Sequence, residues 1–365
     1  MIKVLHLTYD MRIGGTEMVI KNIIEGNVDT NIEMSIYCIE SPLGPWGKDL
    51  KRSGVSVTNT ERKPGFDIRL IKVIREHIQK NKIDILHCHQ YTPWVYGAFA
   101  AMFTNVEVIF TEHGRFYPEV ENWKRRLVNP LLVYLTSQVT AISNATKEAL
   151  CKYEHISNDK IKVIYNGIEP LKSNNKRIAE LRRDLAIREN TIIFGTIARL
   201  DPIKNQVLML RAYSKLFKEF KNTRLLIVGD GEEMTSLKNL ATSLSIENNV
   251  IFTGYISNPI YHIGLIDIFL LSSLSEGTSM TLLEAMSLSK PCIVTDAGGN
   301  SEIIHNDNNG FVVENNNEND FYVAMKTLLA NPELRERMGK SGKRVFDQMF
   351  HQKLMSNEYS ELYRS

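Results

Sequence analysis

The chain has 365 residues, which is long enough for two domains of ordinary size, and its formal net charge at pH 7 is +2. A charge this balanced argues against a general nucleic-acid-binding surface, and no apolar run approaches the roughly 18 residues that span a bilayer. Segment 1–8 enters a strand at once and lacks the layout of a signal peptide. The cysteines are scattered without a CxxC pair, at Cys38, Cys88, Cys151 and Cys292. We therefore expect a reduced, cytoplasmic protein.

Apolar segments alternate with helical patterns along the first half of the chain. Strands are expected at 2–8, 34–39, 55–57, 83–88, 106–111, 139–142 and 161–165. Thr16 is expected to cap a helix over 16–25, and Ser143 with Asn144 is expected to cap another. Residues 68–80 form an amphipathic pattern with isoleucines on one face. The alternation predicts a parallel, doubly wound α/β sheet.

Several candidate ligand-binding residues follow strands of this predicted sheet. Gly15, His89, His113 and Asn166 all lie at carboxyl ends, where open α/β sheets bind ligands. For Gly14-Gly15, the alternative is a tight turn that needs a positive φ. We keep both interpretations of the glycine pair.

Two histidines end the strand over 83–88. His87 and His89 are two residues apart, so they point to the same side of an extended chain. A metal site would need a third and a fourth ligand, and none is well spaced in the sequence. The alternative is a pair of hydrogen-bonded histidines at a strand end.

A second α/β series follows a polar segment, 169–176, that we interpret as a linker. Its strands are expected at 191–197, 224–228, 250–253, 267–271 and 292–295, with helices at 205–220 and 280–288 and helices from the Gly298-Gly299 loop to the end. The predicted domains are 1–168 and 177–350. A last helix within 351–365, amphipathic through Leu354, Tyr359 and Leu362, is expected to pack back on the first domain.

The most informative segment is 272–300, where a polar turn leads into a helix at Met280. Unpaired backbone N–H groups and the helix dipole at such a start suit an anion such as phosphate. Glu276 lies in the turn and Glu284 on the second turn of the helix. Because a carboxylate accepts hydrogen bonds from two neighbouring hydroxyls, the pair indicates a ligand with both phosphate and hydroxyl groups. Two glutamates at this spacing also occur by chance.

The segments SEGTSMTLLEAMSLSKPCIVTDAGGNSEII and ARLDPIKN resemble the signatures of the retaining glycosyltransferases of family 4. The resemblance spans nearly the whole chain and implies the GT-B architecture, with two facing Rossmann-like domains and an active site in the cleft between them. It implies transfer from a nucleotide-diphospho-sugar with retention at the anomeric carbon. The family is discussed as using front-side attack, in which the departing phosphate helps to deprotonate the acceptor hydroxyl.

Arg199 and Lys204 match the basic pair that binds the donor's diphosphate in this family. Negative charge grows on a leaving diphosphate, and a metal ion or fixed cations must stabilise it. The sequence supplies cations and no Asp-x-Asp cluster in a matching place, so we expect a metal-independent enzyme with no tightly bound cofactor. The alternative for each cation is a solvated surface charge.

By resemblance, Glu284 would hold the ribose hydroxyls, Glu276 would contact the donor sugar, and His113 would lie near the reacting carbon. With Arg199 and Lys204, Glu276 and His113 are the catalytic candidates. The other candidate contacts to the donor are Gly15, Gly229 with Gly231, Tyr255 at the base, and the N–H groups of Gly277, Thr278, Ser279 and Met280. The alternative for Tyr255 is a packed aromatic ring. Asn166-Gly167 resembles a structural turn of the family.

A basic and aromatic patch, 123–126, follows segment 115–121 in the first domain. The family's acceptors, which are glycans or lipid-linked sugars, bind in this half. Trp123, Lys124, Arg125 and Arg126 are therefore a candidate contact to an anionic membrane surface, which would make the protein peripheral at the inner face of the membrane. The alternative is an ordinary exposed helix.

The resulting hypothesis is a glycosyltransferase of surface polysaccharide or glycolipid synthesis. Uridine is the expected base of the donor because it is frequent in the family. One rival is a nucleotide-sugar 2-epimerase of related architecture, against which the two motifs argue together. The other is a non-catalytic two-domain binding protein, which the missing export signal disfavours.

Overall fold

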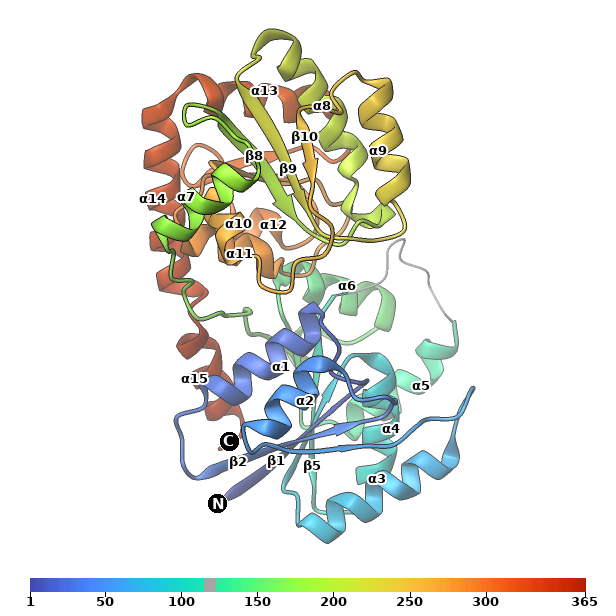
Figure 1. Cartoon of the computed structure of the whole chain (residues 1–365). Helices are drawn as coiled ribbons and strands as arrows, with labels where there is room; N and C mark the ends of the chain where they lie inside the picture. The colour runs from blue at the N-terminus through green and yellow to red at the C-terminus, as the bar shows by residue number, and fades with distance from the viewer. Residues whose placement is uncertain (115–122) are drawn as a thin grey trace. The chain divides into compact units, whose positions relative to one another are not determined.

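A computed structural model of the protein describes residues 1–114 and 123–365. The chain forms two compact units, Met1–Glu169 with Gln352–Ser365, and Pro170–His351. Each unit has one parallel β-sheet with helices packed around it (Figure 1). The α/β class with two parallel, doubly wound sheets is thus confirmed. Helix α7, Asn175–Asp184, begins inside the segment predicted as a linker.

The sheet of the first unit has the strand order β3-β2-β1-β4-β5-β6-β7. The order reverses between β1 and β4, which is where open α/β sheets bind ligands. Its strands are β1 Ile2–Thr8, β2 Ile32–Cys38, β3 Ser56–Asn59, β4 Ile85–His89, β5 Glu107–Glu112, β6 Gln138–Ala141 and β7 Ile161–Val163. Its helices are α1 Gly15–Gly26, α2 Pro45–Arg52, α3 Ile68–Asn81, α4 Tyr91–Ala101, α5 Trp123–Tyr134, α6 Asn144–Glu154 and α15 Gln352–Leu362.

The core of this unit lies on both faces of its central strands. All five residues of β4 are buried, as a strand covered on both faces requires. Trp94 of α4 stacks on Phe110 of β5 with ring centroids 4.1 Å apart. The candidates His89 and His113 lie at the ends of β4 and β5, next to this packing.

The last helix, α15, packs against α1, where the Gln352 side chain donates to the Asn22 carbonyl over 3.0 Å. Tyr359 is buried, as its place in the pattern predicts. Leu354, by contrast, was expected on the buried face and is 39% exposed. The buried stripe runs instead through Met355 and Tyr359, four residues apart, and Leu354 lies about 100° around the helix from Met355.

The second unit has the strand order β10-β9-β8-β11-β12-β13. Its strands are β8 Ile192–Ile197, β9 Thr223–Val228, β10 Val250–Phe252, β11 Ile268–Leu271, β12 Cys292–Thr295 and β13 Gly310–Val313. Its helices are α7, α8 Gln206–Glu219, α9 Met234–Ser243, α10 Ile260–Leu265, α11 Met280–Ser287, α12 Asn300–Ile303, α13 Glu318–Ala330 and α14 Pro332–Met349.

The expectation of helices alone after the Gly298-Gly299 loop is wrong, because β13 pairs in parallel with β12. This four-residue strand lies at the edge of its sheet. Only its pairing with β12 makes so short an apolar run a strand. None of the helices in the described ranges combines the length and apolarity that a bilayer crossing requires.

The helix caps agree only in part with the sequence patterns. Ser143 caps α6 by accepting from the Thr146 backbone N–H, as expected. Thr16 does not cap α1, because Gly14 occupies the N-cap position and Thr16 lies buried in the first turn. Gly14 has an extended φ of −166°, so a positive φ is not what this glycine supplies.

Candidate functional site

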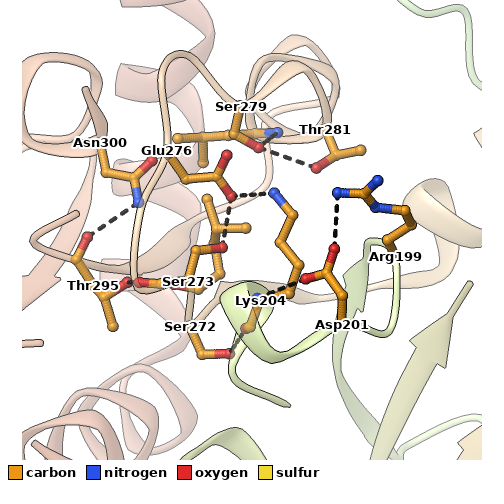
Figure 2. Close-up of polar contacts among 12 residues, drawn as sticks. Arg199, Asp201, Lys204, Ser272, Ser273, Glu276, Ser279, Thr281, Thr295 and Asn300 are labelled. Carbon is orange, nitrogen blue, oxygen red and sulfur yellow. Dashed lines mark hydrogen bonds and ion pairs between the residues drawn. The ribbon is translucent and has the colours of Figure 1, made fainter. Parts of the chain in front are cut away.

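Lys204 and Glu276 form an ion pair in the second unit, with Lys204 Nζ 2.6 Å from Glu276 Oε1 (Figure 2). Ser273 Oγ donates to the same carboxylate oxygen over 2.6 Å. The Glu276 side chain is only 8% exposed. A carboxylate so far removed from water is costly without partners, so Lys204 and Ser273 together hold it in one position.

Hydrogen bonds join the loops that carry this pair, because β8 and β11 are neighbours in the sheet. Lys204 ends a short 3₁₀ turn, Pro202–Lys204, that follows β8, and Glu276 lies between β11 and α11. Ser272 Oγ donates to the Lys204 carbonyl over 2.9 Å (Figure 2). The Leu274 N–H donates to the Ile203 carbonyl over 2.7 Å. The two loops therefore form one cross-linked structure.

Arg199 is held more loosely than Lys204. Its Nη2 lies 2.8 Å from Asp201 Oδ2, and its side chain is 77% exposed. A surface ion pair of this kind contributes about 0–1 kcal/mol. Asp201 is fixed independently, because its side chain caps the 3₁₀ turn by accepting from the Lys204 N–H. Arg199 is thus free to turn toward an anion at little cost.

The structure confirms the predicted start of α11. Ser279 is its N-cap, and its side chain accepts from the Leu282 N–H. Thr278, Ser279 and Met280 are buried, and Gly277 is partly exposed. The loop that leads into the helix carries Glu276, so the carboxylate and the helix N-terminus belong to one turn.

Gly298 lets the loop after β12 approach the Glu276 backbone closely. Its φ is +55°, and a Cβ atom there would lie 1.9 Å from the Glu276 carbonyl oxygen. The Gly299 N–H donates to that same oxygen over 3.2 Å. Any larger residue at position 298 would displace the turn that holds Glu276, because L-residues disfavour this φ and the space is filled.

Gly229 and Gly231 pack against the stretch that carries Arg199. A Cβ atom would lie 1.9 Å from the Ala198 carbonyl oxygen at Gly229, and 2.2 Å from that of Leu200 at Gly231. This close packing explains both glycines without a ligand. Tyr255 follows β10 and is 54% exposed, so it is not the packed aromatic ring of the alternative interpretation.

Glu284 lies on the second turn of α11, where protein atoms take most of the water away from its carboxyl group. This burial raises the pKa of Glu284 to about 7. Near neutral pH the carboxyl group is therefore poised between its two protonation states. Hydroxyl groups that donate to it would favour the ionised form.

In the first unit, His113 is partly exposed and is hydrogen-bonded in series to two buried imidazoles. His113 Nε2 lies 2.8 Å from His89 Nδ1, and His89 Nε2 lies 2.9 Å from His6 Nδ1. Burial lowers the pKa of His113 to about 3 and that of His6 to about 3. These histidines are therefore neutral at physiological pH.

His87 lies beside this chain, with its ring centroid 4.1 Å from that of His89. Both ring nitrogens of His87 have partners, the Tyr363 hydroxyl and the Thr111 hydroxyl, each at 2.7 Å. His87 and His89 thus share one side of β4, and the hydrogen-bonded alternative describes His87.

His6 was not among the predicted site residues, and it stands opposite His87 in the pairing of β1 with β4. Nitrogens of His6, His87 and His89 lie within 4.8 Å of one another, which is compatible with a metal ion. Both ring nitrogens of His87 and of His89 are engaged in hydrogen bonds, whereas His6 Nε2 has no partner among the described residues. The sequence places His6 in an expected strand, but only the pairing register of β1 with β4 brings it opposite His87.

Gly15 begins α1, and a Cβ atom there would meet no atom within 4 Å. The surface at this helix start is therefore open. It leaves room for a ligand, but it does not identify one.

The basic patch lies on α5, and its members differ in their surroundings. Arg125 pairs with the buried Glu154 and lies over the Tyr91 ring, 4.6 Å from its centroid, so it is not a surface charge. Lys124 and Arg126 are exposed. Exposed apolar side chains recur at helical spacing along the same helix, at Trp123, Leu127 and Leu131. Segment 115–121, which precedes the patch, lies outside the described residues.

Two family models match the chain, one described as Glycosyltransferase Family 4 over residues 13–171 and one as Glycosyl transferases group 1 over residues 177–345. An Escherichia coli protein named UDP-Gal:alpha-D-GlcNAc-diphosphoundecaprenol alpha-1,3-galactosyltransferase is 28% identical over 346 residues, 89% of this chain and 87% of that protein. The N-acetyl-alpha-D-glucosaminyl L-malate synthase of Bacillus anthracis is 27% identical over 82% of this chain and 79% of its own.

The fold is similar to that of Anabaena HepE, whose crystal structure in complex with UDP matches with a TM-score of 0.88 and 21% identity over 99% of both chains. The architecture is thus GT-B, and the matches to the two models together extend over both units. The chain belongs to the glycosyltransferases of family 4.

Proposed function

We propose that this glycosyltransferase moves a sugar from a UDP-sugar to a hydroxyl group of a glycan or lipid-linked acceptor, with retention of configuration and without a metal ion. The name of the E. coli relative supports a UDP-sugar donor and an acceptor on a lipid diphosphate. The UDP in the HepE crystal structure supports the same class of donor.

The observation that carries this proposal is the Lys204–Glu276–Ser273 constellation beside the exposed charge of Arg199. An ammonium group has three N–H donors, and Glu276 uses one of those of Lys204. The others remain for phosphate oxygens. Arg199 adds a planar fork of donors, and its exposed pair with Asp201 is weak enough to exchange for a diphosphate. Both cations would stabilise the charge that develops as the leaving group departs.

In this proposal the two glutamates accept hydrogen bonds from hydroxyl groups of the donor. Glu276 is fixed by Lys204 and Ser273, so it would accept from hydroxyls of the donor sugar in a set position. Glu284, with a pKa of about 7, would accept from the two ribose hydroxyls and become ionised on binding. The distal phosphate would accept hydrogen bonds from the N–H groups of Thr278, Ser279 and Met280, with the adjoining Gly277. Gly15 and Tyr255 stay predicted contacts to phosphate and base.

The reaction would then proceed on one face of the sugar. The acceptor oxygen forms a bond to the anomeric carbon, the bond from that carbon to the phosphate oxygen breaks, and the acceptor's proton passes to the leaving phosphate. His113 is neutral, with a pKa near 3, which makes it a poor proton donor and a weak base. Its proposed part is a hydrogen bond to the donor, and not proton transfer.

A peripheral position at an anionic membrane surface would bring the enzyme to a lipid-linked acceptor. The exposed Trp123, Leu127 and Leu131 would enter the interface, and Lys124 and Arg126 would contact the anionic headgroups. In this proposal the protein would lie at the cytoplasmic face of the membrane.

A panel of nucleotide-sugars, offered after exhaustive chelation, tests the proposal. We expect a UDP-sugar to stabilise the protein against heat, by about 2.7 kcal/mol at 100 times its dissociation constant. We also expect slow consumption of that donor in EDTA. NMR of the glycoside formed with an acceptor would show the donor's anomeric configuration. Inversion would contradict retention, and activity that returns only with magnesium or manganese would contradict metal independence.

A further inference from the structure

Three imidazoles in the first unit form one continuous hydrogen-bonded chain. His113 Nε2 is bonded to His89 Nδ1, and His89 Nε2 is bonded to His6 Nδ1. The two end nitrogens, His113 Nδ1 and His6 Nε2, are buried and have no partner among the described residues. The chain therefore has two bonded links and two free ends.

A proton count restricts what the ends can be. A neutral imidazole carries one N–H, so three neutral rings carry three. Each of the two links uses one N–H, which leaves one for the two ends. Either His113 Nδ1 is a donor and His6 Nε2 a bare acceptor, or the reverse. The protonation of His113 thus depends on His6, which it does not contact.

The surroundings favour the first arrangement. A buried N–H without a partner is rarer in proteins than a buried acceptor without one. His6 is fully buried in strand β1, so the bare acceptor belongs there. His113 follows the end of β5, where open α/β sheets bind ligands, so a ligand oxygen can there supply the missing partner of its Nδ1–H.

We propose that His6 and His89 are positioning residues that hold His113 in its neutral Nδ1–H tautomer, ready to donate to an oxygen of the sugar nucleotide. This inference rests on the proposed function for the contact of His113 with the donor. The hydrogen bonds that join the three imidazoles do not depend on that proposed function. His87 supports it from the side, because its own nitrogens are bonded to Thr111 and Tyr363 and do not compete for His89.

The tautomer can be measured directly in the full-length protein with ¹⁵N-labelled histidine. NMR distinguishes a protonated ring nitrogen from a bare one, and the His113 signals are those that disappear in His113→Gln. We expect a protonated Nδ1 and a bare Nε2 in the ligand-free wild type. A bare Nδ1, or a doubly protonated ring at neutral pH, would overturn the proposal without any variant of His6.

A matched pair of variants at position 6 tests whether the tautomer of His113 depends on its hydrogen-bonded link to His6. The amide of His6→Asn lies at the same distance from Cβ as Nδ1 and can donate to His89 as His6 does. The carboxylate of His6→Asp can only accept, so it reverses both links and leaves His113 Nδ1 bare. We expect kcat/KM for the donor to fall about tenfold in His6→Asp and to change little in His6→Asn, with the UDP affinity of both unchanged.

Tyr363→Phe is the control within the same cluster, because it removes the hydroxyl bonded to His87 and leaves the chain intact. An equal loss in this control, or equal losses in the two variants of His6, would reduce the chain to a packing role and overturn the proposal. One equivalent of tightly bound zinc in the purified protein would do the same, since a metal would then occupy the ring nitrogens. If His113→Gln leaves donor kinetics unchanged, the donor contact fails, whereas the tautomer measurement still decides the chain.

Discussion

The two units of the protein differ in how deeply they bury the polar candidate residues that they carry on and after their parallel strands. In the first unit, His6, His87 and His89 are fully buried, and burial lowers their pKa values until they are neutral. In the second unit, Lys204 keeps 22% of its side chain exposed and Arg199 keeps 77%, and each forms an ion pair with a carboxylate. The depth of burial sets the free-energy cost of a charge, because an ion buried without partners costs several kcal/mol and a partly solvated ion pair does not.

This contrast predicts the largest effect at Lys204. Lys204→Ala should lower turnover about 100-fold or more, by analogy with the loss of one fixed transition-state donor, and Arg199→Ala should do so as well. Donor consumption by the chelated enzyme measures it. Lys215→Ala is the matched control, because Lys215 forms a comparable 2.8 Å pair with Glu318 away from the candidate site. Equal activity in the Lys204 and Lys215 variants would show that the Lys204 ammonium group takes no part in the reaction.

Glu284 tests whether burial also prepares a carboxyl group for a ligand in the second unit. Glu284→Ala should weaken UDP binding by about 1.5–3 kcal/mol, which is the range for hydrogen bonds to a charged group. Titration of UDP by calorimetry measures the loss. Unchanged affinity in a folded variant would remove Glu284 from the site.

The raised pKa of Glu284 makes the same binding depend on pH. Below pH 7 the free carboxyl group is mostly protonated, and ribose hydroxyls that donate to it favour its ionised form. UDP should therefore bind more tightly at pH 8 than at pH 6. Glu284→Gln reports the part of the dependence that comes from the diphosphate itself. If wild type and Glu284→Gln have parallel pH profiles, Glu284 does not ionise on binding.

His113 should show the smaller effect of a neutral contact. His113→Ala should lower turnover about tenfold and leave UDP affinity nearly unchanged, because one hydrogen bond to the sugar is lost and none to the nucleotide. Steady-state kinetics and calorimetry on the same preparation separate the two. Equal losses in turnover and in UDP affinity would point to a folding role.

The surface of α5 should give the smallest effect, and only on membranes. Reversal of charge at Lys124 and Arg126 should reduce sedimentation with anionic vesicles and leave consumption of a soluble donor intact, since each basic residue contributes about 1 kcal/mol near such a surface. Arg125 is kept in this variant, because its partner Glu154 is buried. Vesicle binding that responds neither to salt nor to these changes would contradict the assignment.

Local patterns predicted much of this protein. The alternation of strands and helices fixed the α/β class, and the start of α11 at Met280 and the Ser143 cap followed from polar residues before apolar runs. The errors lie where tertiary contacts decide. Strand β13 is defined by pairing with β12, and the buried face of α15 is selected by the surface it packs on.

The sequence by itself determined which residue types the candidate site would contain, since the motifs around Arg199, Lys204, Glu276 and Glu284 are local. It did not determine their partners. Lys204 pairs with Glu276 across 72 positions, and His6 joins His89 across 83 positions. Only the tertiary structure decided these contacts, because the order and register of strands in a parallel sheet bring distant strand ends together, and local periodicity carries no record of that order.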